Sequence, residues 1–433
     1  MRTTIIGLNY LPEPTGIAPY TAGLAEGLQG YGDDVHVISS YPHYPSWAIA
    51  DGYAGRRMKD VVNGVSILRI RPHVTKNPAG MKRLLLEVHF GFRAAFSSWH
   101  SPDVLVLVSP ALFATAVIQI RARLTRRRPS VVVWVQDIYS LGVAETGAMG
   151  ARGASLMKWV ESNVLRRADK VIVIHERFRR VLVSSLRVDP VRVDVVRNWT
   201  HLTPIIVDRQ VYRNKFGWGD ETVVLHAGNM GAKQALESVV DAARLADGMG
   251  APIRFVLLGN GNRRDALRES AQGVERLEFM SPLSDEDFQG AMAAADVLLV
   301  NEKSGIAEMA VPSKLTSYFA AQRPVIAATD EGSITADEIS AANSGVRVNA
   351  GDAQALLDAA LEIGGDAERS AKLGRNGAIY QNRVLSVDTA MARFKEALAS
   401  ISNASSPRRS ISSHPSATDD GVEVDLVEDQ LPR

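Results

Sequence analysis

The segment EMAVPSKLTSYFAAQRPVIAATD, residues 308–330, decides how the chain folds. A Pro-Ser-Lys turn opens a short helix in it, and the apolar run Val325–Ala328 follows the helix at once. A short, continuous apolar run that adjoins a helix is typical of a parallel strand covered on both faces. The turn and helix that precede this strand contain more polar side chains than a helix cap requires. They are Glu308, Ser313, Lys314, Thr316 and Ser317.

The same alternation of apolar strands and amphipathic helices runs through the whole chain. In the first half we expect strands near Thr3–Leu8, Val35–Ser39, Ser66–Ile70, Val104–Val108, Val131–Val135, Lys170–Ile174 and Asp194–Val196. In the second half we expect strands near Val223–Ala227, Ile253–Leu258, Leu277–Phe279, Val297–Val300, Val325–Ala328 and Val346–Val348. The pattern predicts an α/β protein with two doubly wound, parallel-sheet domains.

The length of 433 residues exceeds what one hydrophobic core usually organises, which is up to about 250–300 residues. An irregular, proline-containing segment, NWTHLTPIIVDRQ at 198–210, separates two series of strands and helices. We therefore expect a first domain over 1–199, a second over 210–385, and a C-terminal helix over 386–402 that crosses back to the first domain. The remainder, 403–433, is rich in Ser, Pro and Asp, and we expect it to be a disordered tail.

The composition excludes several kinds of site. There is no cysteine, so disulfides, thiolate metal sites and cysteine nucleophiles are excluded. The nine histidines show no metal-ligand spacing. Asp285, Glu286 and Asp287 open an amphipathic helix, where acids complement the helix dipole, so we expect no metal. The N-terminus has no signal-like apolar region, and Ser109-Pro110 breaks the longest uncharged run, so we expect a cytoplasmic protein.

Charge is divided unevenly between the two halves. Residues 1–200 contain 26 basic and 15 acidic residues, a net charge of +11, whereas the remainder contains 23 and 33, a net charge of −10. Basic residues stand beside apolar ones in KRLLLEVHFGFR (82–93) and RARLTRRRP (121–129). Such segments suit an anionic membrane surface or a diphosphate-bearing substrate, and the alternative is a solvated basic helix face.

The junction after the first strand places a glycine at a helix entrance. In NYLPEPTGIAPYTAGL (9–24), Gly16 and Ile17 stand where free N–H groups and the helix dipole favour an anion. The alternative is a glycine that only the turn geometry requires.

The first junction of the second half is more specific. Gly228 and Gly231 flank a short loop, and Lys233 and Gln234 open the next helix. The helix dipole opposes a lysine at this position. An anion between the lysine and the backbone amides would explain it, and a solvated lysine is the alternative.

Two further junctions carry weaker signals. Gly259, Asn260 and Gly261 turn the chain from a strand into a helix that begins with two arginines. Gln136 and Asp137 end a buried strand, where a carboxylate is costly unless it is paired or used. The alternative for Asp137 is a helix cap.

Together these junctions resemble the retaining, GT-B-fold glycosyltransferases of family 4. The resemblance is strongest to the colanic-acid-type exopolysaccharide transferases linked to fucosyl transfer, and it extends from about Arg2 to Ser400. It implies two Rossmann-like domains that face a central cleft, the first for the acceptor and the second for a nucleotide sugar. The segments that carry it are NYLPEPTGIAPYTAGLAEGL, YPHYPSW, WVQD, RNW, AGNMGAKQALESV, LLGNGNRRDAL and VPSKLTSYFAAQRPVIA.

The resemblance also implies a role for each junction. Gly16 and Ile17 would approach the donor diphosphate through backbone amides, and Lys233 with Asn229 nearby would neutralise it. Among the implied catalytic residues Asp137, Lys233 and Glu308, Glu308 would face the transferred sugar and Asp137 would position acceptor or sugar. The other implied donor-binding residues are Gly228, Gln234, Gly259, Asn260, Gly261, Pro282, Ser313, Lys314, Leu315, Thr316 and Ser317.

The sequence departs from the family pattern at three positions. Ser317 replaces the Glu that holds the ribose, Gln136 replaces the His of a common His-Asp pair, and Asn229 replaces an Arg often paired with the phosphate-binding Lys. These changes bear on the donor sugar and on the way the ribose is held. They leave the phosphate site in place.

The implied reaction moves a sugar from a GDP- or UDP-linked donor to a glycan or polyprenyl-diphosphate-linked acceptor. It would need no cofactor, metal or nucleic acid, and the protein would bind peripherally to the inner face of the cell membrane. One alternative is a nucleotide-sugar epimerase on the same fold, and another is a catalytically silent binding subunit of a polysaccharide assembly. A dehydrogenase is disfavoured because the first glycine loop is not G-x-G-x-x-G.

Overall fold

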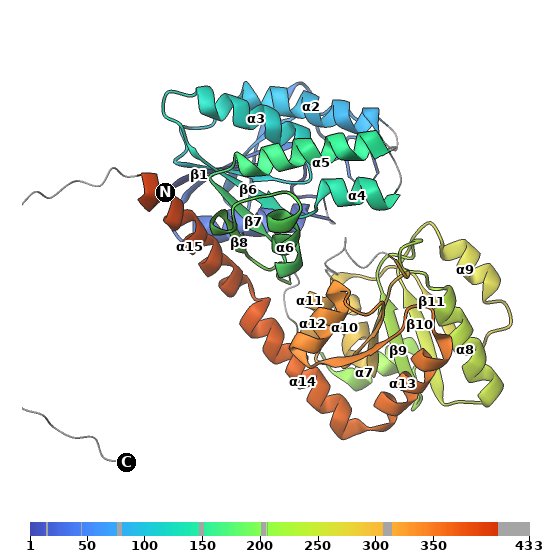
Figure 1. Ribbon diagram of the computed structural model, residues 1–433. Coiled ribbons are helices and arrows are strands. Elements are labelled where there is room, and N and C mark those ends of the chain that lie inside the picture. Colours follow the sequence, from blue (N-terminus) through green and yellow to red (C-terminus); the bar gives the residue numbers. More distant parts are fainter. Residues whose placement is uncertain are drawn as a thin grey trace, which may run out of the picture.

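The computed structural model of the chain describes residues 1–13, 16–44, 46–75, 80–146, 151–200, 205, 207–305 and 314–405. The chain forms two α/β domains, one above the other in Figure 1, and the helices α14 and α15 run along one side of both. The prediction of two doubly wound domains is confirmed.

The first domain is built on an eight-stranded sheet with the order β3-β4-β2-β1-β5-β6-β7-β8. The first strand lies at the centre because the chain adds strands on one side of it and then on the other, which is the doubly wound arrangement. Its strands are β1 (Arg2–Ile6), β2 (Asp34–Ser40), β3 (Arg57–Val62), β4 (Val65–Ile70), β5 (Val104–Val108), β6 (Ser130–Val135), β7 (Lys170–Val173) and β8 (Val193–Val195).

The edge strand β3 was not predicted from the sequence. It pairs antiparallel with β4, while the other strand pairs of this sheet are parallel. Asn63 and Gly64 connect the two strands, and both have positive φ, 50° and 83°. Two such residues between strands make a type I′ turn, so the Asn-Gly dipeptide was the signal that could have revealed this hairpin.

Helices cover both faces of the first sheet. One face packs against α2, α3, α5 and α6, whose apolar residues share one core, and the other packs against α1 and α15. The helices of this part of the chain are α1 (Ala18–Gly30), α2 (Met81–Ala95), α3 (Leu112–Leu124), α4 (Tyr139–Thr146), α5 (Ala151–Arg166) and α6 (Glu176–Ser184), with a short 3-10 helix at Pro190–Arg192.

The second domain is built on a six-stranded parallel sheet with the order β11-β10-β9-β12-β13-β14. Here too the first strand of the domain, β9, lies in the interior of the sheet. Its strands are β9 (Thr222–Ala227), β10 (Ile253–Leu258), β11 (Leu277–Met280), β12 (Val297–Asn301), β13 (Val325–Ala328) and β14 (Gly345–Val348).

The second sheet is also covered on both faces. The helices α8, α9 and α13 share a core with one face, and α7, α10, α11, α12 and α14 pack on the other. They are α7 (Arg209–Phe216), α8 (Glu237–Met249), α9 (Arg264–Ser270), α10 (Asp285–Ala294), α11 (Lys314–Ala320), α12 (Ile334–Ala342), α13 (Ala353–Gly365) and α14 (Ala367–Val384).

The last helix, α15 (Val387–Ser405), returns to the first domain (Figure 1). Phe394 is fully buried there, and its ring meets the ring of Trp134 edge-on at 5.1 Å. The helix continues three residues into the range that we expected to be a tail, and residues 406–433 lie outside the described part of the chain. No helix of the described residues combines the length and apolar character needed to cross a membrane.

A buried carboxylate joins the two domains. Glu338 of α12 is 4% exposed and lies 3.1 Å from Nε2 of His175, forms an ion pair with Arg197, and accepts a hydrogen bond from Tyr380 at 3.3 Å. His175 and Arg197 belong to the first domain, at the carboxyl ends of β7 and β8. Because Nδ1 of His175 accepts a hydrogen bond from the backbone N–H of Arg177, the ring proton is on Nε2. Nε2 therefore donates a hydrogen bond to the carboxylate of Glu338.

Burial alone would raise the pKa of Glu338, but the hydrogen bond from His175 and the charge of Arg197 outweigh burial and lower the pKa below its usual value. The ionised form of Glu338 therefore stabilises the folded protein. This contribution is present above the unfolded-state pKa of about 4.3 and is lost as the pH falls through the lower folded-state pKa.

We expect Glu338→Gln to lower the melting temperature at pH 7, because it leaves the buried charge of Arg197 unanswered. Breaking such a pair costs about 3–5 kcal/mol. The difference from the wild type should shrink in acid, where the wild-type carboxylate is protonated. Thermal unfolding from pH 3 to 8 measures both effects. Glu362→Gln is the control, since it breaks the surface pair of Glu362 with Arg369, and an equal loss in the two variants would contradict the prediction.

Candidate functional site

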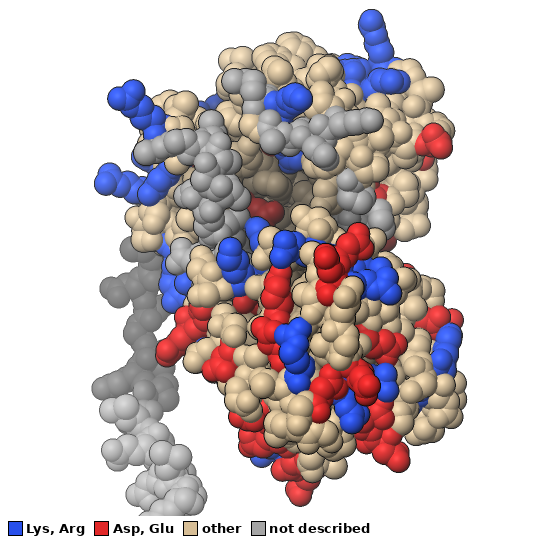
Figure 2. Space-filling view, turned by 90° about the vertical axis from the view of Figure 1, so that its right-hand side faces the viewer, with Lys and Arg blue, Asp and Glu red and all other residues tan. Residues whose placement is uncertain are grey.

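Residues that follow strands of the first sheet lie opposite residues that follow strands of the second. Asp137, after β6, interacts electrostatically with Lys233, which lies in the segment after β9. Arg177, after β7, donates a hydrogen bond to the carbonyl of Gly332, after β13. Figure 2 shows the hollow between the two domains. The carboxyl ends of the strands, where ligands bind in doubly wound domains, thus border one cleft.

Asp137 is an acid held in an unusual state on the first-domain side of this cleft. Solvent reaches its side chain, but the surrounding protein restricts hydration, and this burial raises its pKa to about 6 while Lys233 opposes the rise. Asp137 is not needed as a cap of α4, because the carboxylate of Glu161 accepts the N–H groups of Tyr139 and Ser140 at 2.7 and 3.0 Å. A carboxylate without such a structural task, beside a lysine of the other domain, is available for a ligand.

The neighbouring Gln136 has a structural task. Its side-chain amide exchanges two hydrogen bonds, of 3.2 and 2.9 Å, with the amide of Asn198, which lies beyond β8. Both side chains are buried. The pair fixes the end of β6 against the segment that leads to the second domain, and thereby fixes the backbone that carries Asp137.

Two glycine-containing loops, which follow β9 and β10, pack against each other at the carboxyl ends of the strands of the second sheet. Gly228 has a φ of +135° and Gly259 a φ of +136°. A Cβ atom on Gly259 would lie only 2.0 Å from the carbonyl oxygen of Gly228, and one on Gly261 only 2.4 Å from the carbonyl oxygen of Met230. Hydrogen bonds between the loops, such as Met230 N–H to the Asn260 carbonyl at 2.8 Å, hold them together.

The loop between β9 and α8, which carries Lys233, is held in shape by hydrogen bonds of its own side chains. Gln234 accepts hydrogen bonds from the side chain of Asn229 at 3.3 Å and from the N–H of Gly231 at 3.1 Å. Asn229 is therefore engaged in holding the loop. The Lys233 side chain is exposed, and its backbone carbonyl accepts the N–H of Lys303 at 2.8 Å, which ties the loop to the end of β12.

Lys314 points into the same region from the start of α11. Its ammonium lies 3.4 Å from Nε2 of His226, and a Cβ on Gly228 would lie 3.5 Å from it. Burial lowers the pKa of Lys314 to about 8, and Glu302 opposes this shift. His226 was not singled out from the sequence, because a histidine within an apolar strand is usually a core residue.

The remaining predicted residues fall into three groups. Gly16 has a φ of +71° and lies beside Tyr44, and Ile17 precedes α1. Leu315 belongs to the core, and Pro282 is exposed beyond the end of β11. Glu308 and Ser313 lie outside the described residues, so their predicted roles stay predictions.

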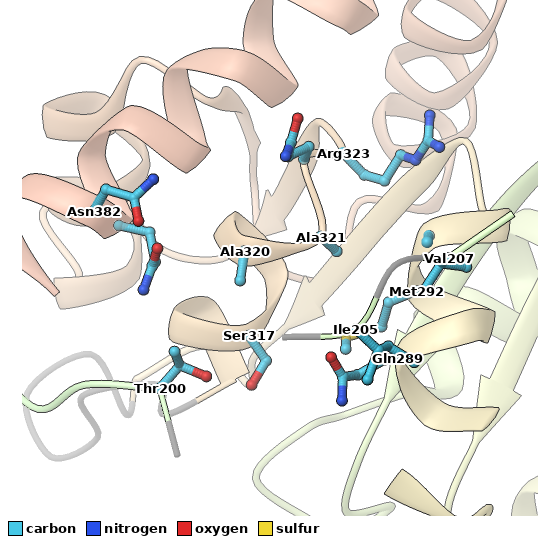
Figure 3. Close-up of a pocket in the computed structure, with 13 residues that line it drawn as sticks. Thr200, Ile205, Val207, Gln289, Met292, Ser317, Ala320, Ala321, Arg323 and Asn382 are labelled. Carbon is cyan, nitrogen blue, oxygen red and sulfur yellow. The ribbon is translucent and has the colours of Figure 1, made fainter. Parts of the chain in front are cut away.

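Thr316 and Ser317 face two different neighbours. The hydroxyl of Thr316 lies against the hydroxyl of Tyr20 of the first domain. Ser317 lines a cavity of about 340 Å³, where its hydroxyl and the polar end of Thr200 point toward one another (Figure 3). Gln289 of α10 and residues of α14 complete this cavity. The predicted contact of Ser317 with a ribose stays a prediction.

Glu13 is a functional candidate that the sequence reading did not identify. It is 3% exposed, and its carboxylate accepts the N–H groups of His43 and Tyr44 at 2.8 and 2.9 Å and the side chain of Asn9 at 2.8 Å. It thereby ties the loop after β1 to the loop after β2. A lone acid within a proline-rich loop was the available signal.

The acidic residues Asp285, Glu286 and Asp287 lie in the first turn of α10, where Ser284 caps the helix. The hydroxyl of Ser284 accepts the N–H of Asp287, and the Asp287 carboxylate pairs with Lys215 at 2.5 Å. This agrees with the interpretation of Asp285, Glu286 and Asp287 as helix-start residues. Within the described residues, no group of three or more His, Asp or Glu side chains could hold a metal ion.

Comparison with protein families gives two matches. A model described as "Glycosyl transferase 4-like domain" matches residues 15–199, and one described as "Glycosyl transferases group 1" matches residues 208–379. The chain is 31% identical over 338 residues to the putative colanic acid biosynthesis glycosyl transferase WcaI of Escherichia coli K12, covering 74% of this chain and 81% of that protein. It is 25% identical over 210 residues to the probable glycosyltransferase WbjE of Pseudomonas aeruginosa, covering 46% of this chain and 51% of that protein.

The fold is similar to that of solved glycosyltransferases. The sucrose-phosphate synthase of Thermosynechococcus elongatus superposes with a TM-score of 0.70 at 17% identity, over 94% of this chain and all of that one. Anabaena HepE, solved in complex with UDP, superposes with a TM-score of 0.66 at 16% identity, over 92% of this chain and all of that one. At these identities the likeness concerns the fold alone.

We expect Gly259→Ala to destabilise the second domain by roughly 2–6 kcal/mol, because the new methyl group meets the Gly228 carbonyl at a φ that side chains rarely adopt. Gly248→Ala is the control, since Gly248 ends α8 with open space around it, and it should change stability by about 1 kcal/mol or less. Thermal unfolding of both variants measures the difference. Equal melting temperatures of the two variants would contradict the expected clash between the new methyl group and the Gly228 carbonyl.

Proposed function

The chain belongs to the GT-B-fold glycosyltransferases of family 4, of the colanic-acid type, and from this premise we propose a specific reaction for it. As a glycosyltransferase of polysaccharide biosynthesis, it moves a sugar from a nucleotide diphosphate to a lipid-linked glycan, with retention of the anomeric configuration and without a metal ion. The observation that carries the proposal is the juxtaposition of Asp137 and Lys233 across the cleft.

The donor occupies the second-domain side of the cleft. Gly228 places no side chain at the end of β9, and the exposed ammonium of Lys233 on the same loop offers positive charge to a diphosphate. The complexes of Anabaena HepE with UDP and with UDP-glucose support a nucleotide-sugar donor for this fold. A GDP-linked and a UDP-linked donor both fit this chemistry.

The reaction breaks the bond between the anomeric carbon and the diphosphate oxygen, and the electron pair leaves with the diphosphate. Lys233 stabilises the charge that develops there, and one such donor is typically worth about 10²–10³ in rate. The acceptor hydroxyl attacks from the face that the diphosphate leaves, and its proton passes to the departing phosphate oxygen. Asp137 orients the acceptor or the sugar from the opposite wall of the cleft.

The acceptor is held by the first domain, and this domain meets an anionic membrane. Its helices α2, α3 and α5 form one outer layer (Figure 1), which exposes the apolar side chains of Leu85, Phe92, Phe96, Ile120, Leu124, Leu156 and Trp159. Lys82, Arg126 and Arg127 are exposed basic residues of the same layer. Apolar side chains with cations around them suit the headgroup region of an anionic bilayer.

The structure corrects part of the sequence-based reasoning about this surface. Leu86 and Phe90 are core residues, 0% and 1% exposed. Arg83 pairs with Glu87, and Arg93 donates hydrogen bonds to the carbonyls of Arg71 and Arg56. These arginines hold the domain together, so a test of membrane binding must change other cations.

We expect Lys233→Ala to abolish transfer while the protein stays folded, because Lys233 is exposed and supplies positive charge to the departing diphosphate. Lys372→Ala, at an exposed lysine of α14, is the control and should keep full activity. The assay measures transfer of radiolabelled sugar from GDP- and UDP-sugars to lipid acceptors in EDTA. Activity that needs added Mg²⁺ or Mn²⁺ contradicts the metal-free mechanism, and full activity of Lys233→Ala contradicts the donor site. Conversion of the donor sugar without an acceptor would indicate the epimerase instead.

We expect the protein to co-sediment with anionic vesicles and to release as salt rises, because each exposed cation near the surface contributes about 1 kcal/mol and is screened by salt. The double change Arg126→Gln and Arg127→Gln should weaken binding about tenfold or more. The matched change Lys372→Gln and Arg375→Gln, on the second domain, should leave binding unchanged. Equal binding of all three proteins, or no binding at low salt, is incompatible with this surface.

A further inference from the structure

Lys314 places a second ammonium under the loop that carries Lys233. It is the first residue of α11, and its side chain extends toward the end of β9. The ammonium lies 3.4 Å from Nε2 of His226, and a Cβ atom on Gly228 would lie 3.5 Å from it. Because residue 228 is a glycine, no side chain screens this ammonium from the loop above it.

Among the residues that the structure describes, which exclude Glu308, no carboxylate forms an ion pair with Lys314. The ammonium of Lys314 contacts His226, and because an ammonium can only donate, Nε2 of His226 is the acceptor. Burial and the charge of Lys314 lower the pKa of His226 well below its usual value, so the imidazole is neutral. Glu302 acts on Lys314 only at longer range, and its two oxygens accept hydrogen bonds from Thr329 and Thr335, both at 2.6 Å.

Lys314 is half-buried, and a cation in such a place that has no ion-pair partner among the described residues is costly to the folded protein. The structure accordingly lowers the pKa of Lys314 to about 8, mainly through burial. A residue of this kind is explained if an anion completes the site during function. The loop at Gly228 is the place where such an anion can approach Lys314 closely, since Gly228 has no side chain beside the ammonium.

We propose that Lys314 is a second cation for the donor diphosphate, that His226 positions it, and that Lys314 and Lys233 hold the diphosphate from two sides of the Gly228 loop. The proposal rests on the proposed function, because it assigns a residue to the same donor. It gives the site selectivity for diphosphates over monophosphates, because two fixed cations answer the additional negative charge of the second phosphate group.

Titration calorimetry of the full chain with UDP, GDP, UMP, GMP and inorganic pyrophosphate tests the proposal. Lys314→Met should weaken the binding of the preferred nucleoside diphosphate by about 10- to 100-fold, the range of a hydrogen bond between charged groups, and that of the monophosphate much less. Lys372→Met should change neither. The melting temperature of Lys314→Met without ligand should equal or exceed that of the wild type, because the variant no longer buries an unpaired charge.

The pH dependence gives a second readout that does not need a variant. Above pH 8 the free enzyme loses the proton of Lys314, so wild-type affinity for the diphosphate should fall between pH 7 and 9. Among the described residues, the titratable groups that act on Lys314 are His226, which stays neutral over this range, and the carboxylate of Glu302. In Lys314→Met the fall should be smaller. If Lys314→Met does not fold, the wild-type profile decides alone.

Three results would overturn the proposal. They are unchanged diphosphate affinity in Lys314→Met, an equal loss for diphosphate and monophosphate, and a wild-type affinity that does not decline toward pH 9. Failure of the proposed function has a different signature. If the wild type binds neither UDP nor GDP but binds pyrophosphate in a way that depends on Lys314, the cation site stands and the nucleotide-sugar donor does not.

Discussion

The buried carboxylate of Glu338 fixes the relation on which the rest of the structure depends. It takes a hydrogen bond from His175 and an ion pair from Arg197, both in the first domain, while its own helix belongs to the second. A charge in such a place is stable only when its partners are in position, so these contacts define one arrangement of the domains. In that arrangement Asp137 and Lys233 interact across the cleft.

The cleft shows that local charge differs from the charge of the domain that carries it. Residues 201–433 have a net charge of −10, and acidic side chains are prominent on the second domain in Figure 2. At the carboxyl end of its sheet, however, the second domain presents Lys233 and Lys314 beside the loop at Gly228. The first domain, with its net charge of +11 over residues 1–200, places Asp137 opposite them. Asp137, Lys233 and Lys314 thus each carry a charge opposite in sign to the net charge of their own half of the chain.

Much of the fold could be predicted because buried parallel strands have a simple sequence signature. Val104–Val108, Ile253–Leu258 and Val325–Ala328 have the predicted bounds, since an uninterrupted apolar run leaves little choice of burial or period. The strand β3 escaped the same reasoning because its side chains alternate between half-buried and exposed at the edge of the sheet. The Lys233 loop could be found because glycines and a lysine stand between a strand and a helix. The prediction that Lys233 and Gln234 open that helix was wrong, because α8 begins at Glu237 and both residues lie in the turn before it.

By itself, the sequence determined two doubly wound domains and the family to which the chain belongs, because each follows from residues close together in the chain. It also predicted the junctions at which ligands would bind. The tertiary structure alone decided which distant residues meet. Glu338 and His175 are 163 positions apart, and His226 and Lys314 are 88 apart. Neither pair has a local pattern, since the energy of such a contact depends on burial and on partners that only the packed domains provide.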